Sequence, residues 1–347
     1  MLGNIQNTST TKPNLNEVSF MRPILIVLLV AYHAFCPWDG KWDAFTGFMP
    51  NDAYKWFDRG VYAFMLESFV FISGYIWAFQ RNEQGRKESL KQLISKKFNR
   101  LIVPSIVFSI LYLLVLQPNG LIINGIIGGG KLLLTILGGA GHMWFLLMLF
   151  WCFVYTWLIE QIKIDSKYKL LITILLMSLV ILPNYFRMSQ AFKYLPFFYG
   201  GYFVRGHISR IRNGINTRSV VGLWILFIIT FIGLYFVRDN YLPILRSTSS
   251  VLFKYATTGC QFVYSAIGTV AFFATAIVIT DKHRLPKRYI EVGKLCFGVY
   301  IWQQFILKII YYKTDIPIYI GSAFLPWLSF LITLLLSYYL AKVTKEI

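Results

Sequence analysis

The sequence has few charged residues and is especially short of acidic ones. Only 14% of its 347 residues are charged, with 15 Asp and Glu against 34 Lys and Arg, while 56% are hydrophobic. The apolar residues stand in blocks of about 15 to 25, long enough to cross a hydrocarbon core roughly 30 Å thick. A soluble domain spreads its apolar residues periodically instead. The shortage of charge therefore excludes an ordinary soluble protein and predicts a polytopic integral membrane protein.

Cysteine and histidine are scarce as well, with four of each. Cys152, Cys260 and Cys296 fall inside apolar blocks, and no Cys/His pair between the blocks has metal-ligand spacing. Neither a disulfide framework nor a zinc site is expected on these grounds, and no metal is expected. The polar start "MLGNIQNTSTTKPNLNEVS" does not resemble a cleaved signal peptide, and we expect residues 1–18 to form a flexible tail.

The formal net charge of +19 suggests nucleic acid at first sight. However, the basic residues lie in short runs between the apolar blocks, which is the topology signal of membrane proteins. We therefore expect the lipid bilayer as a partner and no nucleic acid.

The pattern predicts an all-α bundle of about ten transmembrane helices, forming a single domain over residues 1–347. The fifth and sixth spans are interrupted by Pro, Gly and polar residues, so short, tilted or broken helices are expected there. No soluble appendage or internal repeat is evident, so the functional residues must lie in the bundle or its loops. The expected spans are 20–36, 61–80, 101–117, 143–160, 170–182, 190–205, 219–237, 251–280, 292–312 and 323–341.

Orientation follows from Lys and Arg in the short loops. The segments "RNEQGRKESLKQLISKKFNR", "RGHISRIRNGINTR" and "DKHRLPKR" carry seven, four and four cations, respectively. The alternate connections are sparser in cations, and the loop 37–60 has four Asp against three cations. Both termini are therefore predicted to be cytoplasmic, with the other set of loops outside: 37–60, 118–142, 183–193, 238–250 and 313–322.

The first span carries two polar residues, Arg22 and His33. Their eleven-residue separation is three helical turns plus about 20°, so both side chains lie on nearly one face, about 16 Å apart along the axis. Ionisable residues inside spans are costly and often functional. The competing interpretation makes Arg22 a boundary anchor and His33 an interfacial residue bonded to a neighbouring helix.

The second span, "LESFVFISGYIWAF", adds Glu67 and the pair Ser73-Gly74. A carboxylate beside an imidazole orients the ring and stabilises its protonated form, so Glu67 is a candidate partner of His33. Alternatively, Glu67 is a lone acid near the outer boundary. Ser73-Gly74 is more typical of close helix packing than of a catalytic serine.

Two further stretches supply candidate binding residues. In "SKKFNRLIVP", at the mouth of the third span, Lys97 and Arg100 are candidates for gripping phosphate, although topogenic charge is a competing explanation. In "GHMWFL", His142 and Trp144 lie at the outer end of the fourth span, where aromatic belts are also expected.

Together these residues resemble the acyltransferase 3 family of membrane O-acyltransferases over nearly the whole chain. The ninth span, "VGKLCFGVYIWQQ", departs from the pattern by having Gln303-Gln304 where many relatives have a histidine. The residues that carry the resemblance are Arg22 and His33, Phe71, Ser73, Gly74 and Tyr75, Arg100 and Pro104, and His142, Trp144 and Phe145.

The resemblance implies transfer of an acyl group, most often acetyl, from cytoplasmic acyl-CoA to a sugar hydroxyl of a surface polysaccharide or lipid-linked saccharide. In that setting, His33 would act as general base or would itself receive the acyl group, and Arg22 would hold a CoA phosphate. Acyl-CoA is then a substrate, no bound cofactor is expected, and the location is a cell membrane such as the bacterial cytoplasmic membrane.

A transporter or flippase for a lipid-linked saccharide is the main rival, and a structural membrane subunit is a third interpretation. The oligomeric state is left open.

Overall fold

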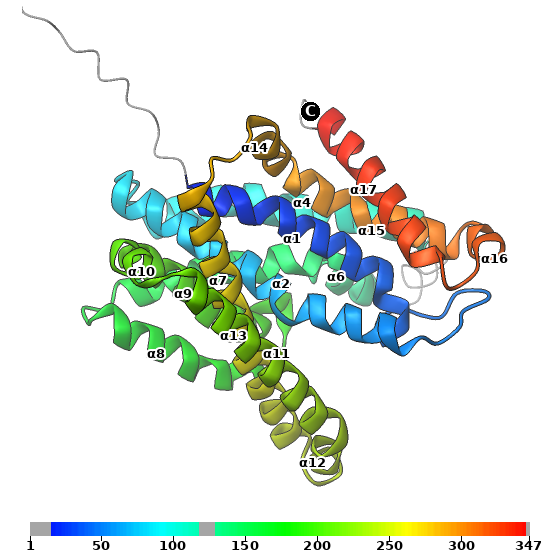
Figure 1. The fold of residues 1–347 in the computed structure, drawn as a ribbon, viewed down its shortest axis with the longest axis horizontal. Coiled ribbons are helices and arrows are strands. Elements are labelled where there is room, and N and C mark those ends of the chain that lie inside the picture. Colours follow the sequence, from blue (N-terminus) through cyan, green and yellow to red (C-terminus); the bar gives the residue numbers. More distant parts are fainter. Residues whose placement is uncertain (1–14, 118–128, 345–347) are drawn as a thin grey trace, which may run out of the picture.

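The computed structural model describes residues 15–117 and 129–344, and every regular element within these ranges is helical (Figure 1). The predicted all-α membrane bundle is confirmed. Residues 1–14 of the expected tail and 118–128 of the expected loop 118–142 lie outside the described residues. The helices are α1 Asn16–Phe35, α2 Asp52–Ala78, α3 Leu90–Lys97, α4 Val103–Leu116, α6 Gly129–Leu137, α7 Trp144–Glu160, α8 Ser166–Leu176, α9 Met188–Gly206, α10 Ile208–Gly214, α11 Thr217–Asn240, α12 Leu242–Thr248, α13 Ser250–Lys282, α14 Lys287–Lys294, α15 Cys296–Tyr312, α16 Ile316–Ile320 and α17 Leu325–Thr344.

Seven helical stretches of the described chain are long and apolar enough to cross a membrane, or eight if a bent pair counts as one span. The bent pair is α14 with α15, which meet at 61° and coincide with the predicted ninth span. The count of ten and the cytoplasmic placement of the termini stay predictions. The seven stretches are Asn16–Asp39, Asp52–Glu83, Leu90–Leu116, Gly141–Glu160, Thr217–Thr248, Ser250–Lys282 and Leu325–Thr344.

Helices α8 and α9 occupy the weak fifth and sixth predicted spans. Helix α8 has only 11 residues, and α9 has 19 with Pro196 inside it. The glycines of α9 allow its backbone to contact α2: a Cβ atom on Gly201 would lie 1.9 Å from the Phe71 carbonyl oxygen. The polar and small residues that weakened the sequence signal therefore serve a helix that is packed inside the bundle.

Ion pairs tie together the helix ends at one end of the bundle. Glu17, in the first turn of α1, pairs with Arg205 at the end of α9 and with Arg212 of α10. Arg212 also pairs with Asp281 at the end of α13, and Arg205 with Glu83 just after α2. The start of α1 and the ends of α2, α9 and α13 therefore meet at this end.

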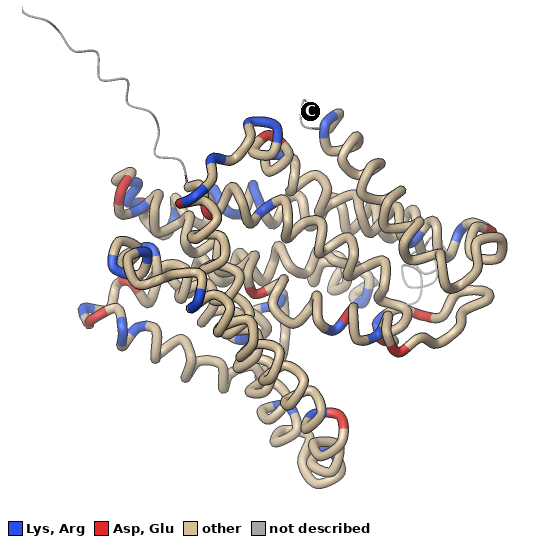
Figure 2. The backbone as a smooth tube through the Cα atoms, viewed as in Figure 1, with Lys and Arg blue, Asp and Glu red and all other residues tan. Residues whose placement is uncertain are grey.

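The opposite end is joined by a second set of contacts. Arg59, near the start of α2, pairs with Asp39 after α1 and with Asp239 of α11. The Tyr54 hydroxyl donates to the Ala323 carbonyl oxygen, which places the start of α17 here. Helix α17 therefore runs back towards the end where α1 begins. Figure 2 shows basic positions around the start of α1 and along α10 and α14.

Candidate active site

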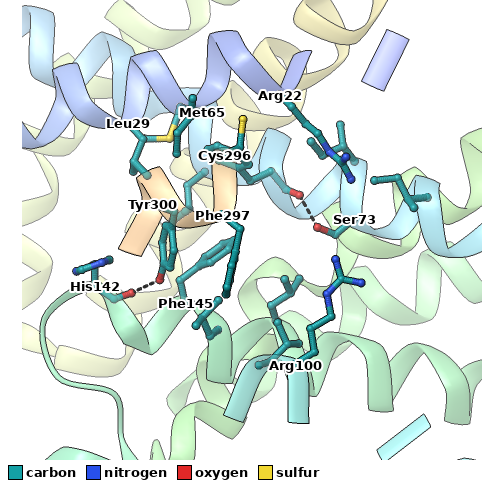
Figure 3. A pocket seen from close by; sticks show the side chains of 18 of the residues that line it. Arg22, Leu29, Met65, Ser73, Arg100, His142, Phe145, Cys296, Phe297 and Tyr300 are labelled. Atoms are coloured by element: carbon teal, nitrogen blue, oxygen red, sulfur yellow. Dashed lines mark hydrogen bonds between the residues drawn. The ribbon is translucent and has the colours of Figure 1, made fainter. Parts of the chain in front are cut away.

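A cavity of about 340 Å³ lies between α1, α2, α7 and the α14–α15 break, and the π-helical residues Phe98–Ile102 that join α3 to α4 contribute one side (Figure 3). Its size is within the usual range for small-molecule sites. The residues that line it are mostly apolar and aromatic, with a few cations and two histidines. They include Arg22, Ile26, Leu29, Tyr32, His33, Tyr62, Phe69, Ser73, Trp77, Gln80, Lys97, Arg100, His142, Trp144, Phe145, Phe153, Lys294, Cys296, Phe297 and Tyr300.

Helix α1 contributes a single face to this cavity. Arg22, Ile26, Leu29 and His33 all line it, and their spacings of four, three and four residues return each side chain to the same side of the helix. Arg22 and His33 therefore share one cavity, as their eleven-residue separation predicts. They stand about 16 Å apart along the helix axis, near opposite ends of the cavity.

One end of the cavity is cationic. In Figure 3 the guanidinium groups of Arg22 and Arg100 point towards each other, and Lys97 also lines the cavity. Lys294 is paired with Glu291, whereas Arg22, Lys97 and Arg100 form no ion pair with any carboxylate in the described chain. Three cations without a carboxylate partner around one opening produce a positive potential that favours an anion. Lys97 and Arg100 therefore lie where the sequence analysis expected a phosphate grip.

The other end holds His33, whose side chain is buried with 7% of its surface exposed. Its Nδ1 has no side-chain hydrogen-bond partner among the described residues, and its polar neighbour within the helix is the Leu29 backbone, one turn earlier. The Trp42 ring stacks on it at 5.7 Å and 21°, and the His142 ring centroid lies 6.4 Å away. The imidazole is thus held mainly by ring contacts, and no side chain of the described residues is bonded to its Nδ1.

His142 lies at the same end but is fully engaged. Its Nε2 is 3.1 Å from the Ile301 carbonyl oxygen, which can only accept, so Nε2 carries a proton and donates it. Its Nδ1 is 2.9 Å from the Gln304 side-chain Oε1, and the Tyr300 hydroxyl donates to the His142 carbonyl oxygen at 2.6 Å. Of the two histidines that line the cavity, His33 is therefore the one free to exchange a proton with a ligand. His142 forms a fixed wall.

Trp144, two residues after His142, lines the cavity and packs against Phe145 and Tyr194. On α2, Ser73 also lines the cavity, but its hydroxyl donates to the Phe69 carbonyl oxygen at 2.8 Å, one turn earlier. Such a bond within the helix is a structural role. Ser73 therefore has no base beside it that would make it a nucleophile.

Glu67 and Tyr75 do not line the cavity, which corrects the expected pairing of Glu67 with His33. Cavity-facing positions on α2 include Phe69 and Ser73. Glu67 precedes Phe69 by two positions and Tyr75 follows Ser73 by two, a rotation of about 200° to the opposite side of the helix. The expectation failed because it considered depth in the membrane and not the face of the helix.

On that opposite side, Glu67 is 1% exposed, and its Oε1 accepts from the Gln261 amide at 3.2 Å. The Lys193 ammonium donates to the Oε1 of Gln261 at 2.7 Å. Tyr75 donates to Glu17 and accepts from Arg205. Both residues therefore belong to polar contacts that join α2 to α1, α9 and α13.

Several residues around His33 could not be identified from the sequence. Trp42 lies in a loop, and Lys308 is a charge near the end of a span; neither has a local signal that would assign it to the site. Tyr300 and Gln304 stand in the motif-like ninth span, and only the fold reveals that both bind His142. Gln304, which stands where many relatives have a histidine, is therefore a hydrogen-bond partner of His142.

Comparison with known families gives one match: a family model described as an acyltransferase domain (Acyl_transf_3) matches residues 15–343. Comparison with curated proteins and with solved structures gave no match. The family match covers nearly the whole chain, including each helix that builds the cavity. The chain therefore belongs to the acyltransferase 3 family, and its helical bundle is that of a membrane acyltransferase.

Proposed function

We propose that this membrane acyltransferase transfers an acetyl group from acetyl-CoA to a sugar hydroxyl of a surface polysaccharide or lipid-linked saccharide. The observation that carries the proposal is a single cavity that joins three cations without a carboxylate partner to an imidazole whose Nδ1 is bonded to no side chain of the described residues. The donor binds from the Arg22 end, on the side predicted to be cytoplasmic, and the acceptor reacts at His33.

The donor fits the charge pattern of the cavity. The phosphates of CoA lie at the mouth against Arg22, Lys97 and Arg100, where guanidinium groups offer two parallel donors to phosphate oxygens. The pantetheine arm is narrow and largely apolar, which suits the aromatic walls between the two ends. The separation of about 16 Å along α1 then brings the thioester towards His33.

The chemistry requires a base because a sugar hydroxyl is a poor nucleophile. His33 takes the hydroxyl proton as the sugar oxygen bonds to the thioester carbonyl carbon. The carbon–sulfur bond then breaks, and the proton passes from the imidazole to the CoA sulfur, so that free CoA leaves without net proton release. General-base catalysis of this kind contributes about 10² to 10⁴ in rate.

The test uses the purified full-length protein in lipid nanodiscs with acetyl-labelled acetyl-CoA. The acceptor is a polysaccharide extract from cells that lack the protein. Label should move into the extract, and mass analysis should show sugar rings heavier by one acetyl group, with equimolar release of CoA. Release of CoA without labelled sugar would reduce the activity to thioester hydrolysis. Absence of both would overturn the proposal.

A further inference from the structure

The polar face of α15 continues beyond the cavity. Tyr300 and Gln304 both bind His142, and Lys308 follows at the same four-residue spacing. Positions i, i+4 and i+8 lie along one side of a helix. The face of α15 that contacts His142 therefore continues to Lys308. This lysine lies beyond the His33 end of the cavity, on the side predicted to be extracytoplasmic.

Lys308 and His33 both contact the ring of Trp42. The Lys308 ammonium lies 4.0 Å from the Trp42 ring centroid, and His33 stacks on the same indole with ring centroids 5.7 Å apart. Trp42 is half-buried in the loop that follows α1, and Lys308 also lies 4.7 Å from the Tyr312 ring. A single flat aromatic ring is thus in contact with both the imidazole and a cation.

Lys308 differs from Lys41, the other lysine near His33, in having no carboxylate partner among the described residues. Lys41 lies 2.7 Å from Asp58 and 2.9 Å from Asp39. Burial lowers the pKa of Lys41, but the interactions with Asp58, Cys36 and Asp39 together outweigh burial and hold this pKa above its usual value. Lys308 forms no ion pair with a carboxylate in the described ranges, so its charge is available to a ligand.

We propose that the space held by Trp42 between His33 and Lys308 is the acceptor subsite, and that it takes a saccharide carrying a carboxylate or a phosphate. This inference rests on the proposed function. A sugar ring that replaces the indole presents a hydroxyl to His33 on one side and its anionic group to Lys308 on the other. Sugar rings and indoles share flat apolar faces, so the ring contacts of Trp42 mark a position that suits a pyranose.

Binding without acetyl-CoA tests the subsite separately from catalysis. The probe is a fluorescent, end-labelled fragment of the surface polysaccharide from cells that make the protein, titrated against the full chain in nanodiscs. Losing a charge-assisted contact is expected to weaken binding about tenfold in Lys308→Gln and little in Lys308→Arg. The matched control is Lys313→Gln, which removes an exposed lysine five residues further on. Trp42→Ala vacates the subsite and should bind the fragment several-fold more tightly.

Chemical treatment of the probe identifies the anionic group. Carboxyl reduction should abolish the difference between wild type and Lys308→Gln if an acidic sugar binds there, and removal of phosphate should do so if a phosphorylated acceptor binds. Equal affinities of wild type and Lys308→Gln for the untreated probe, absence of binding to wild type, or weaker binding by Trp42→Ala would each overturn the subsite. Lys308-dependent binding without acyl transfer would instead overturn the proposed function alone.

Discussion

Gly74 and Phe198 hold α2 and α9 in direct backbone contact: a Cβ atom on Gly74 would lie 1.9 Å from the Phe198 carbonyl oxygen. The contact is reciprocal, since Gly201 of α9 meets Phe71 of α2 in the same way. Small residues allow such close approach between helices in membranes. Because α2 carries one wall of the cavity, this crossing sets the position of that wall relative to α9.

Gly74→Ala should therefore destabilise the protein by about 2 kcal/mol, because the added methyl group has no space and the helices must shift. The measurement is thermal unfolding in detergent, where Tm should fall by a few degrees. Gly60→Ala, on the same helix with no atom within 4 Å of the new Cβ, should leave Tm unchanged or raise it. Equal Tm values for the two variants would show that the crossing tolerates separation.

The sequence predicted those features of the site that depend on one helix. Arg22 and His33 share a face because eleven residues are close to three turns, and the close-packing interpretation of Gly74 is confirmed. The same arithmetic applied to α2 would have removed Glu67 and Tyr75, which lie two positions from the cavity-facing Phe69 and Ser73.

Contacts between distant elements could not be predicted. Gln304 binds His142 across 162 positions of the chain, and Trp42 reaches His33 from a loop. Hydrophobic periodicity carries no information about which helix faces which, since membrane helices are apolar on all sides. Residues such as Lys308 resemble ordinary boundary charges until the fold places them.

The predicted topology has a direct test. In a background with the four native cysteines replaced by serine, Thr46→Cys should be labelled by a membrane-impermeant maleimide from outside intact cells. Lys87→Cys should be labelled only after the membrane is opened, because it lies in the most basic connection. Both positions are exposed. The reverse labelling pattern would invert the orientation and put the Arg22 end of the cavity outside.

Arg100 is expected to set donor affinity, because it stands at the cationic end without a carboxylate partner in the described chain. Arg100→Lys keeps the charge but loses the paired donors, so the KM for acetyl-CoA should rise several-fold, and Arg100→Ala should raise it further. Arg86→Ala is the matched control, an exposed arginine of the same basic connection that does not line the cavity. Unchanged donor KM in both Arg100 variants would reduce the residue to a topology signal.

Gln304 is expected to act as a positioning residue through His142. Gln304→Leu leaves the His142 Nδ1 without its amide partner, so kcat should fall about tenfold while the KM for acetyl-CoA is retained. Gln303→Leu is the control, since it removes a buried amide whose Oε1 has no hydrogen-bond partner in the described chain. The control should keep its activity and its Tm. Equal losses in the two variants would indicate general damage to α15 and not a role for the His142 contact.

His33 carries the sharpest prediction. His33→Ala should abolish acylation and leave Tm nearly unchanged, because the Nδ1 of the imidazole bonds to no other side chain of the described residues. His33→Gln should be almost as inactive, since an amide fills the space but cannot take the hydroxyl proton. In wild type, activity should fall as the pH drops, because protonation removes the lone pair that the base uses. Protein level and monodispersity in detergent are measured alongside the product. Full acylation by a well-folded His33→Gln variant would return this residue to a structural role beneath Trp42.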